Sequence, residues 1–185
     1  MRLVVIVGES GGGKSTLQRA LCDEFGWERV VSCTTRQPRR GEKDGISYKF
    51  LSREEFDDFE RRKKFFEVAE YDGEKYGTLR QDLFSDNVRV MVRTPSGAKA
   101  LKEVYGNGVF IVYLKVDAKT RIGALRLRGE KEEVIQKRVA EDRVVFKDAE
   151  RMASITLTNR SFKMLPKCLA SLVGNTVLKT FSDGF

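Results

Sequence analysis

A glycine-rich segment from Gly8 to Ser15 constrains the fold of this chain most strongly, because its letters, GESGGGKS, have the spacing of a phosphate-binding loop. An apolar run, Leu3 to Val7, precedes it and predicts a buried strand. Residues with the spacing of an amphipathic helix follow it: Leu17, Ala20, Leu21 and Phe25. A merely flexible glycine turn is the alternative, but it does not require this strand, loop and helix order. The segment therefore predicts a nucleotide site.

Each position of the loop has an expected contact. Backbone N–H groups of the glycines curl round a polyphosphate, the Lys14 side chain reaches its terminal phosphates, and the Ser15 hydroxyl binds Mg²⁺. The helix expected to begin near Lys14 adds the positive end of its dipole. The residues predicted to bind ATP are Gly8, Ser10, Gly11, Gly12, Gly13, Lys14, Ser15 and Thr16, with Ser15 as the metal ligand.

Composition limits the class of protein. The chain has 185 residues, 41% of them hydrophobic, which suits a single α/β domain. No apolar stretch approaches the length of a membrane span, and the N-terminus enters the first predicted strand without a cleavable signal, so a soluble cytoplasmic protein is expected. Three widely spaced cysteines indicate a reducing compartment. The absence of histidine excludes histidine general bases and leaves Lys, Arg, carboxylates and hydroxyls.

The formal net charge of +8 has two interpretations. Clustered cations suit a nucleic-acid backbone, and they equally suit a cleft that gathers phosphorylated nucleotides. The cleft is favoured because the cluster from Arg36 to Arg40 lies beside nucleotide-type motifs and lacks an aromatic stacking pattern. The second cluster, Arg61 to Lys64, is interpreted as a solvated helix end. We expect nucleotide partners, no nucleic acid, no membrane, and a monomer or homodimer.

Strand and helix signals alternate along the chain, which predicts a three-layer α/β fold with its site at the carboxyl ends of the strands. Further strands are expected at Val30–Cys33, Val88–Val92, Val109–Val116 and Ile155–Thr158. Ser52 to Glu55 has the spacing of a capping box, and Asp117 can cap a later helix. The charged stretch from Arg121 to Arg151 predicts exposed, mobile helices, and Leu165, Leu169 and Leu172 are expected on one face of the last helix.

A second group of motifs begins at Ser32. The segment from Ser32 to Glu42 reads SCTTRQPRRGE, and it is followed by Gly45, Tyr48, Phe50, then FEVAE at 66–70 and YGT at 76–78. With the phosphate loop, these motifs cover the first 78 residues, and they resemble the guanylate kinase family. Later residues fit more loosely: Arg128-Gly129-Glu130 and Arg138 resemble the lid arginines, shortened by one residue, and Asn159 follows the last strand.

The resemblance implies a P-loop kinase fold with a parallel sheet core, a small inserted lobe that binds the nucleoside monophosphate (NMP), and a helical lid. The whole chain, 1–185, would form one domain with a core at 1–31, 79–120 and 150–185, an NMP lobe at 32–78 and a lid at 121–149. Asn159 would join the ATP site, and Thr94 the substrate site. The implied substrate residues are Ser32, Arg36, Arg39, Tyr48, Glu67, Tyr76, Thr78 and Thr94.

Residue chemistry supports these roles. Arg36 and Arg39 flank the stiffening Pro38, and their planar guanidinium groups suit a monophosphate dianion, to which Tyr48 and Tyr76 can also donate. The Glu67 carboxylate can accept the adjacent N1–H and N2–H groups that guanine presents on one edge. Hydroxyls of Ser32 and Thr78 would face O6.

One segment departs from the family pattern. The family has Asp-x-Asp before a glutamine and a glycine, whereas this chain reads Val92-Arg93-Thr94-Pro95-Ser96-Gly97. Val92 thus replaces a carboxylate near the metal, and Thr94 replaces one that helps to hold guanine. The preferred base is therefore guanine held less tightly, or a modified or different base.

The sequence favours phosphoryl transfer from MgATP to a purine NMP, chiefly GMP or dGMP. The catalytic residues expected are Lys14, Arg36, Arg39, Arg128 and Arg138, with the last two contacting the transferred group after lid closure. The alternatives are an NMP kinase with altered base specificity, a phosphorylated-sugar kinase, a non-catalytic binding module of guanylate-kinase shape and, least favoured, a nucleic-acid-binding ATPase.

Overall fold

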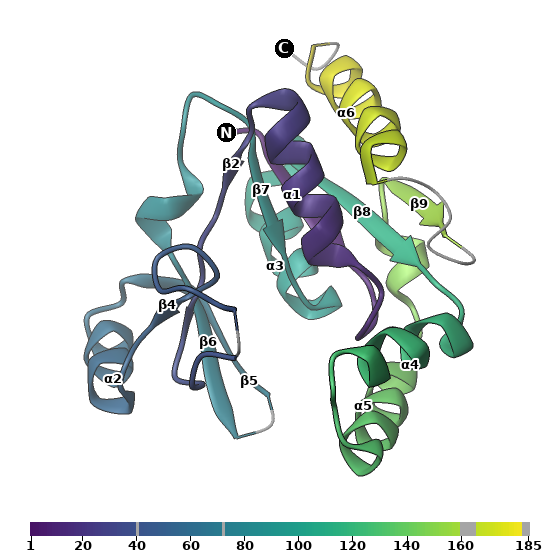
Figure 1. Cartoon of the computed structure of the whole chain (residues 1–185). Coiled ribbons are helices and arrows are strands. Elements are labelled where there is room, and N and C mark those ends of the chain that lie inside the picture. Colours follow the sequence, from purple (N-terminus) through teal and green to yellow (C-terminus); the bar gives the residue numbers. More distant parts are fainter. Residues whose placement is uncertain (40, 72, 160–165, 183–185) are drawn as a thin grey trace.

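Five parallel strands form the central sheet, in the order β2-β7-β1-β8-β9 (Figure 1). The computed structural model describes residues 1–39, 41–71, 73–159 and 166–182. The strands span Leu3–Val7 (β1), Glu28–Arg29 (β2), Arg89–Val92 (β7), Val109–Lys115 (β8) and Ile155–Thr158 (β9). Every residue of β1 is buried, as a central strand covered on both faces requires.

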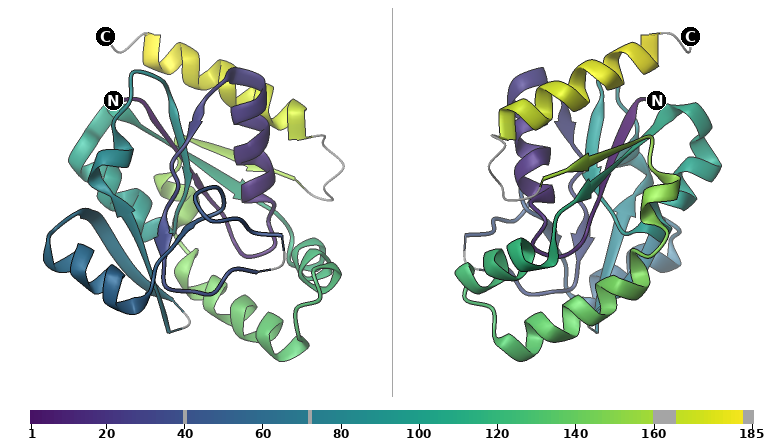
Figure 2. Two further views of the ribbon diagram at one scale, coloured as in Figure 1. Left: turned by 60° about the vertical axis from the view of Figure 1, so that its left-hand side comes forward. Right: turned by 90° about the vertical axis from the view of Figure 1, so that its right-hand side faces the viewer.

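Helices cover both faces of this sheet, which gives the predicted three layers (Figure 2). Side chains of β1 alternate between the two cores: Val4 and Ile6 face helix α1 (Lys14–Phe25) and helix α6 (Pro166–Ser182), while Leu3 and Val5 face helix α3 (Pro95–Tyr105). Short 3₁₀ turns η1 (Arg80–Leu83), η2 (Gly106–Gly108) and η3 (Ala149–Met152) connect these elements.

A second, mixed sheet lies in the segment between Cys33 and Leu79, in the order β4-β3-β6-β5. Its strands span Cys33–Thr34 (β3), Lys49–Phe50 (β4), Phe65–Tyr71 (β5) and Glu74–Leu79 (β6). Helix α2 (Arg53–Arg61) begins with the predicted capping box of Ser52 and Glu55. Phe56 of α2 is fully buried and stacks on Phe65 at 4.4 Å between ring centroids, so the small lobe has its own core.

Two helices follow β8 and lie near the carboxyl end of the central sheet (Figure 1). They are α4 (Ala118–Leu127), which Asp117 caps as predicted, and α5 (Glu132–Val145). A small apolar cluster of Leu125, Ile135 and Val139 joins them. No helix in the described ranges is long and apolar enough to cross a membrane.

Two expectations from the sequence are wrong in detail. The predicted strand Val30–Cys33 is divided, because Val30 N–H donates to Val90 O at 2.9 Å in the central sheet, whereas the Ser32 carbonyl accepts from Lys49 N at 2.8 Å in the small sheet. This segment is therefore where the chain crosses from one sheet to the other. On α6, Leu172 is 49% exposed, and the buried face carries Leu169, Val173, Val177 and Phe181 instead; Leu165 lies outside the described residues.

Candidate active site

The glycine loop lies between the carboxyl end of β1 and the start of α1. Gly11 and Gly13 have left-handed backbone conformations, with φ of 75° and 86°. A Cβ atom on Gly11 would also lie 2.6 Å from the Arg121 carbonyl oxygen, so only glycine fits there. Among the described residues, no side chain caps α1, whose first turn therefore offers amide donors and the positive end of the dipole to an anion.

Lys14 rests inside this loop. Its ammonium group donates to the Glu9 carbonyl oxygen at 2.9 Å. Burial lowers the pKa of Lys14 to about 8, the carboxylates of Asp142 and Glu9 oppose that shift, and Arg128 and Arg121 add to it. Phosphate groups bound beside Lys14 would favour its charged form, so the loop is suited to hold a polyanion.

A cavity of about 300 Å³ opens beside the loop, which is at the small end of the range for ligand sites. Asn159 is 5% exposed, and its backbone N–H donates to the Lys115 carbonyl oxygen at 2.9 Å. Ser15 and Thr16, at the start of α1, are exposed. The structure thus brings several predicted ATP residues together around one space, lined by Gly11, Gly12, Gly13, Thr16, Leu17, Leu114, Ala124, Arg128, Asn159, Pro166 and Leu169.

Arg36 stands in a second cluster of polar and aromatic side chains. Both carboxylate oxygens of Glu42 accept from Arg36 Nη2, at 2.8 and 2.9 Å, and Glu42 also accepts from the Arg39 amide at 2.8 Å. The Arg36 guanidinium lies 5.5 Å from the Tyr48 ring centroid, and Tyr48 meets Tyr76 edge to face. Arg36, Tyr48 and Tyr76 therefore lie together, whereas Arg39 is exposed. Glu42, to which the sequence analysis gave no role, orients the Arg36 guanidinium.

The predicted base reader, Glu67, lies on β5 opposite Thr78 of β6. Its Oε1 accepts from Thr78 Oγ1 at 2.8 Å and forms an ion pair with Arg93 Nε at 2.9 Å. Thr94 is the N-cap of α3 and accepts from Gly97 N at 3.3 Å. A Cβ atom on Gly97 would lie 3.5 Å from both Glu67 Oε2 and Thr94 Oγ1, so these oxygens face the same glycine.

Arg93 is a residue that sequence reasoning missed. Its side chain is 10% exposed, Nη1 donates to Val92 O at 3.0 Å, and Nη2 has no hydrogen-bond partner in the described part of the chain. Burial lowers the pKa of this guanidinium, and Glu67 opposes the shift. An arginine directly after a buried strand was the available signal. Ser32, also buried, lies one residue before β3 and so beside the strand that carries Thr78.

The two predicted lid arginines differ in their surroundings. Arg128 lines the cavity beside the glycine loop. Arg138 instead forms an ion pair with Glu130 at 3.0 Å, and its side chain is 13% exposed. Contact of Arg138 with a transferred phosphoryl group therefore stays a prediction that requires this pair to open.

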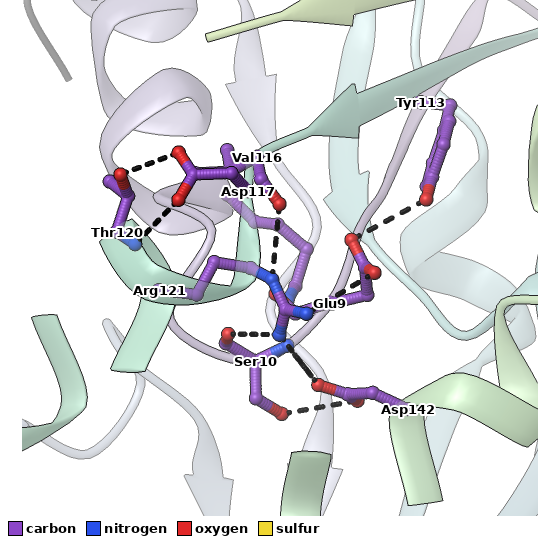
Figure 3. A network of polar contacts seen from close by, with 9 residues as sticks. Glu9, Ser10, Tyr113, Val116, Asp117, Thr120, Arg121 and Asp142 are labelled. Carbon is purple, nitrogen blue, oxygen red and sulfur yellow. Dashed lines mark hydrogen bonds and ion pairs between the residues drawn. The ribbon is translucent and has the colours of Figure 1, made fainter. Parts of the chain in front are cut away.

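The charged stretch after β8 also contains buried charged groups, which corrects part of the expectation of exposed helices. Arg121 and Asp142 are 4% and 6% exposed and meet beside the glycine loop (Figure 3). Asp142 is three residues after the apolar Val139, and Arg121 is four before Leu125, so each stands on the inner face of its helix. Opposite charges at inward positions were the sequence signal for this pair.

A parallel sheet with a glycine loop after its first strand, a small lobe carrying an arginine and tyrosine cluster, and a helical pair beside the loop define a P-loop nucleoside monophosphate kinase. The guanylate kinase family model matches residues 1–175. The chain belongs to the guanylate kinase family.

Individual relatives agree with this membership. The chain is 31% identical over 169 residues to a guanylate kinase of Mycoplasma genitalium, covering 87% of this chain and 70% of that protein. It is 38% identical over 143 residues to a guanylate kinase of Desulfitobacterium hafniense, covering 74% and 72%. The crystal structure of guanylate kinase from Anaplasma phagocytophilum shares the fold, with a TM-score of 0.72 at 22% identity over 96% of this chain and 85% of that one.

Proposed function

We propose that this chain transfers the terminal phosphoryl group of ATP to a purine NMP, with GMP and dGMP as its main substrates. A phosphate oxygen of the NMP forms a bond to the γ-phosphorus of ATP, the bond from that phosphorus to the β,γ-bridging oxygen breaks, and ADP and the nucleoside diphosphate result. The observation that carries the proposal is the pairing of Glu67 with Thr78 in the same small sheet whose neighbouring loop holds Arg36 beside Tyr48 and Tyr76.

The protein contributes position and charge to this reaction, since the acceptor is already an anionic nucleophile. Lys14 and the loop amides hold the donor phosphates, while Arg36, Arg39 and the tyrosines hold the acceptor phosphate. Arg128 and, once released from Glu130, Arg138 stabilise the charge on the transferred group. Lid closure excludes water that would otherwise hydrolyse ATP.

The Ser15 hydroxyl fits a magnesium ligand, because Ser15 is exposed in the first turn of α1, directly after the glycine loop that is proposed to hold the donor phosphates. When bound, Mg²⁺ neutralises charge on the donor phosphates. We assign NMP binding to the lobe 32–78 and closure over the bound nucleotides to the lid 121–149, both attached to the core at 1–31, 79–120 and 150–185. The cellular location that we propose for this protein is the cytoplasm.

A coupled assay of ADP release, run across the common ribo- and deoxyribonucleoside monophosphates, tests the function. GMP and dGMP should give the highest kcat/KM. A kinase with broadened base specificity is the second candidate, favoured by Thr94 and the Arg93–Glu67 ion pair, and it predicts comparable rates with IMP. ADP release that no monophosphate stimulates would contradict both.

A further inference from the structure

A buried group of charges joins both lid helices to the glycine loop (Figure 3). Arg121 of α4 forms ion pairs with Asp142 of α5 at 3.2 Å and with Glu9 of the loop at 3.4 Å. Its Nε also donates to the Val116 carbonyl oxygen at 3.2 Å. All three nitrogens of the guanidinium are therefore engaged inside the protein.

The side chains of Arg121 and Asp142 contact every polar group of Ser10, which lies in the middle of the loop. Its amide donates to Asp142 Oδ2 at 2.9 Å, and its hydroxyl donates to Asp142 Oδ1 at 3.4 Å. Its carbonyl oxygen accepts from Arg121 Nη1 at 3.3 Å. The path of the backbone through Ser10 is thus fixed from outside the loop.

Glu9 extends the same arrangement to the phosphate-binding groups. Its carboxylate accepts from the Tyr113 hydroxyl at 3.4 Å in addition to its pair with Arg121. Its carbonyl oxygen accepts from Lys14 Nζ at 2.9 Å and from the Gly12 amide at 3.1 Å. Arg121 therefore holds the Glu9 side chain, and the Glu9 carbonyl oxygen in turn holds Lys14, the residue proposed to contact the phosphates.

We propose that Arg121 and Asp142 are positioning residues for ATP. They hold the Glu9–Ser10 turn, so that the loop amides and Lys14 have their phosphate-binding arrangement before ATP arrives, and they anchor α4 and α5 to that turn. The proposal rests on the proposed kinase function. It assigns no contact with the reacting atoms to either residue.

Whether one substitution weakens or strengthens ATP binding distinguishes positioning of the loop from a simple charge effect. Asp142 carries negative charge beside a loop that binds a polyanion, and like charges repel. If Asp142 acted only through its charge, Asp142→Asn would strengthen ATP binding. If it positions the loop, the same change weakens ATP binding, because the amide cannot accept with both of its terminal atoms as the carboxylate does.

A second ion pair between the same helices supplies a matched control. Arg126 of α4 contacts Glu132 of α5 through Nη2 at 2.9 Å and Nε at 3.0 Å. The two side chains are 58% and 51% exposed, and their side-chain hydrogen bonds in the described part of the chain, including that of Gln136 to Glu132, lie within the lid. Glu132→Gln therefore removes an interhelical charge without touching the loop.

The experiment measures the Kd of MgATP by calorimetry without any NMP, together with KM for ATP and for GMP. Asp142→Asn should raise the Kd and KM of ATP by roughly ten-fold or more, the loss expected for hydrogen bonds to a charged group, and should leave KM for GMP within about two-fold. Glu132→Gln should match the wild type. Unchanged or tighter ATP binding in Asp142→Asn would overturn the proposal, as would an equal loss in Glu132→Gln.

Asp142→Asn leaves Arg121 partly unpaired, so folding needs its own control. The double variant Arg121→Met with Asp142→Leu removes both charges and keeps an apolar interior, and thermal unfolding checks that each variant is folded at the assay temperature. Weak ATP binding in a folded double variant supports positioning; wild-type binding overturns it. Because Kd is measured without NMP, a wild type that binds MgATP but phosphorylates no NMP would contradict the proposed function alone.

Discussion

Glu67 is already engaged within the protein, since its Oε1 contacts both Thr78 and Arg93. Guanine presents two donors in parallel, and a carboxylate reads both most fully with two accessible oxygens. Oε2, which faces Gly97, remains for the base, beside a Thr94 hydroxyl that already caps α3. We therefore expect the 2-amino group of guanine to be weakly recognised.

Thr94→Asp tests this expectation. Aspartate is as good an N-cap as threonine, so α3 should stay intact while the pocket gains an acceptor. A hydrogen bond to a charged group contributes about 1.5–3 kcal/mol, so kcat/KM for GMP should improve by roughly ten- to a hundred-fold relative to IMP. Glu67→Gln should shift the ratio the opposite way. An unchanged ratio in Thr94→Asp would place Thr94 away from the base.

Individual residues also show which features of the site the sequence could predict and which it could not. The spacing of the loop glycines predicted that Gly11 and Lys14 lie in the turn between β1 and α1, because the geometry of that loop is local. Arg93, by contrast, meets Glu67 across 26 positions, and Arg121 meets Glu9 across 112. Contacts between distant segments depend on how strands and helices pack, so a local pattern can indicate that Arg121 faces inward but does not identify Glu9 as its partner.

Among the elements, long and strongly patterned segments were predictable. β1, β8 and α1 all lie where the apolar residues predicted them, because burial against the sheet decides their structure. The Val30–Cys33 segment was not predictable, because its apolar residues Val30 and Val31 lie between β2 and β3, where the chain passes from one sheet to the other. Leu172 was misplaced because the inner face of α6 follows a spacing of four residues from Leu169.

At the scale of the lid helices, we predict that Arg128 and Arg138 stabilise the charge on the transferred phosphoryl group. Arg128→Ala and Arg138→Ala should each lower kcat strongly, since an arginine that stabilises the charge on a transferring phosphoryl group is worth roughly 10³–10⁵-fold in related phosphoryl transfers. Thermal unfolding should be little changed for Arg128→Ala. Steady-state kinetics at saturating ATP and GMP measure the effect, and near-wild-type turnover in both variants would remove the arginines from the mechanism.

For the whole molecule, the net charge of +8 requires an explanation. Several cations are paired on the surface, for example Lys115 with Glu150 at 2.8 Å and Arg151 with Asp148 at 3.2 Å, and exposed pairs of this kind contribute little. Arg36, Arg128 and Lys14 instead stand at the two proposed nucleotide sites. This distribution favours steering of small polyanions into the cleft.

Duplex DNA or RNA should consequently bind only weakly and compete little with ATP. Any binding that occurs should fall steeply as salt rises, because it would consist of counterion release without specific contacts. Fluorescence anisotropy with labelled duplexes at low and physiological salt measures this. Sub-micromolar affinity that persists at high salt would show a nucleic-acid function that this account lacks.

The central claim is that the loop around Lys14 and the lobe around Glu67 serve one transfer between two nucleotides. Separation of products after mixing MgATP with GMP tests it most directly. We predict ADP and GDP in equal amounts from the wild type, and a loss of at least about 10²-fold for Lys14→Ala with an unchanged fold. ADP formed without GDP, or equal turnover in Lys14→Ala, would contradict the account.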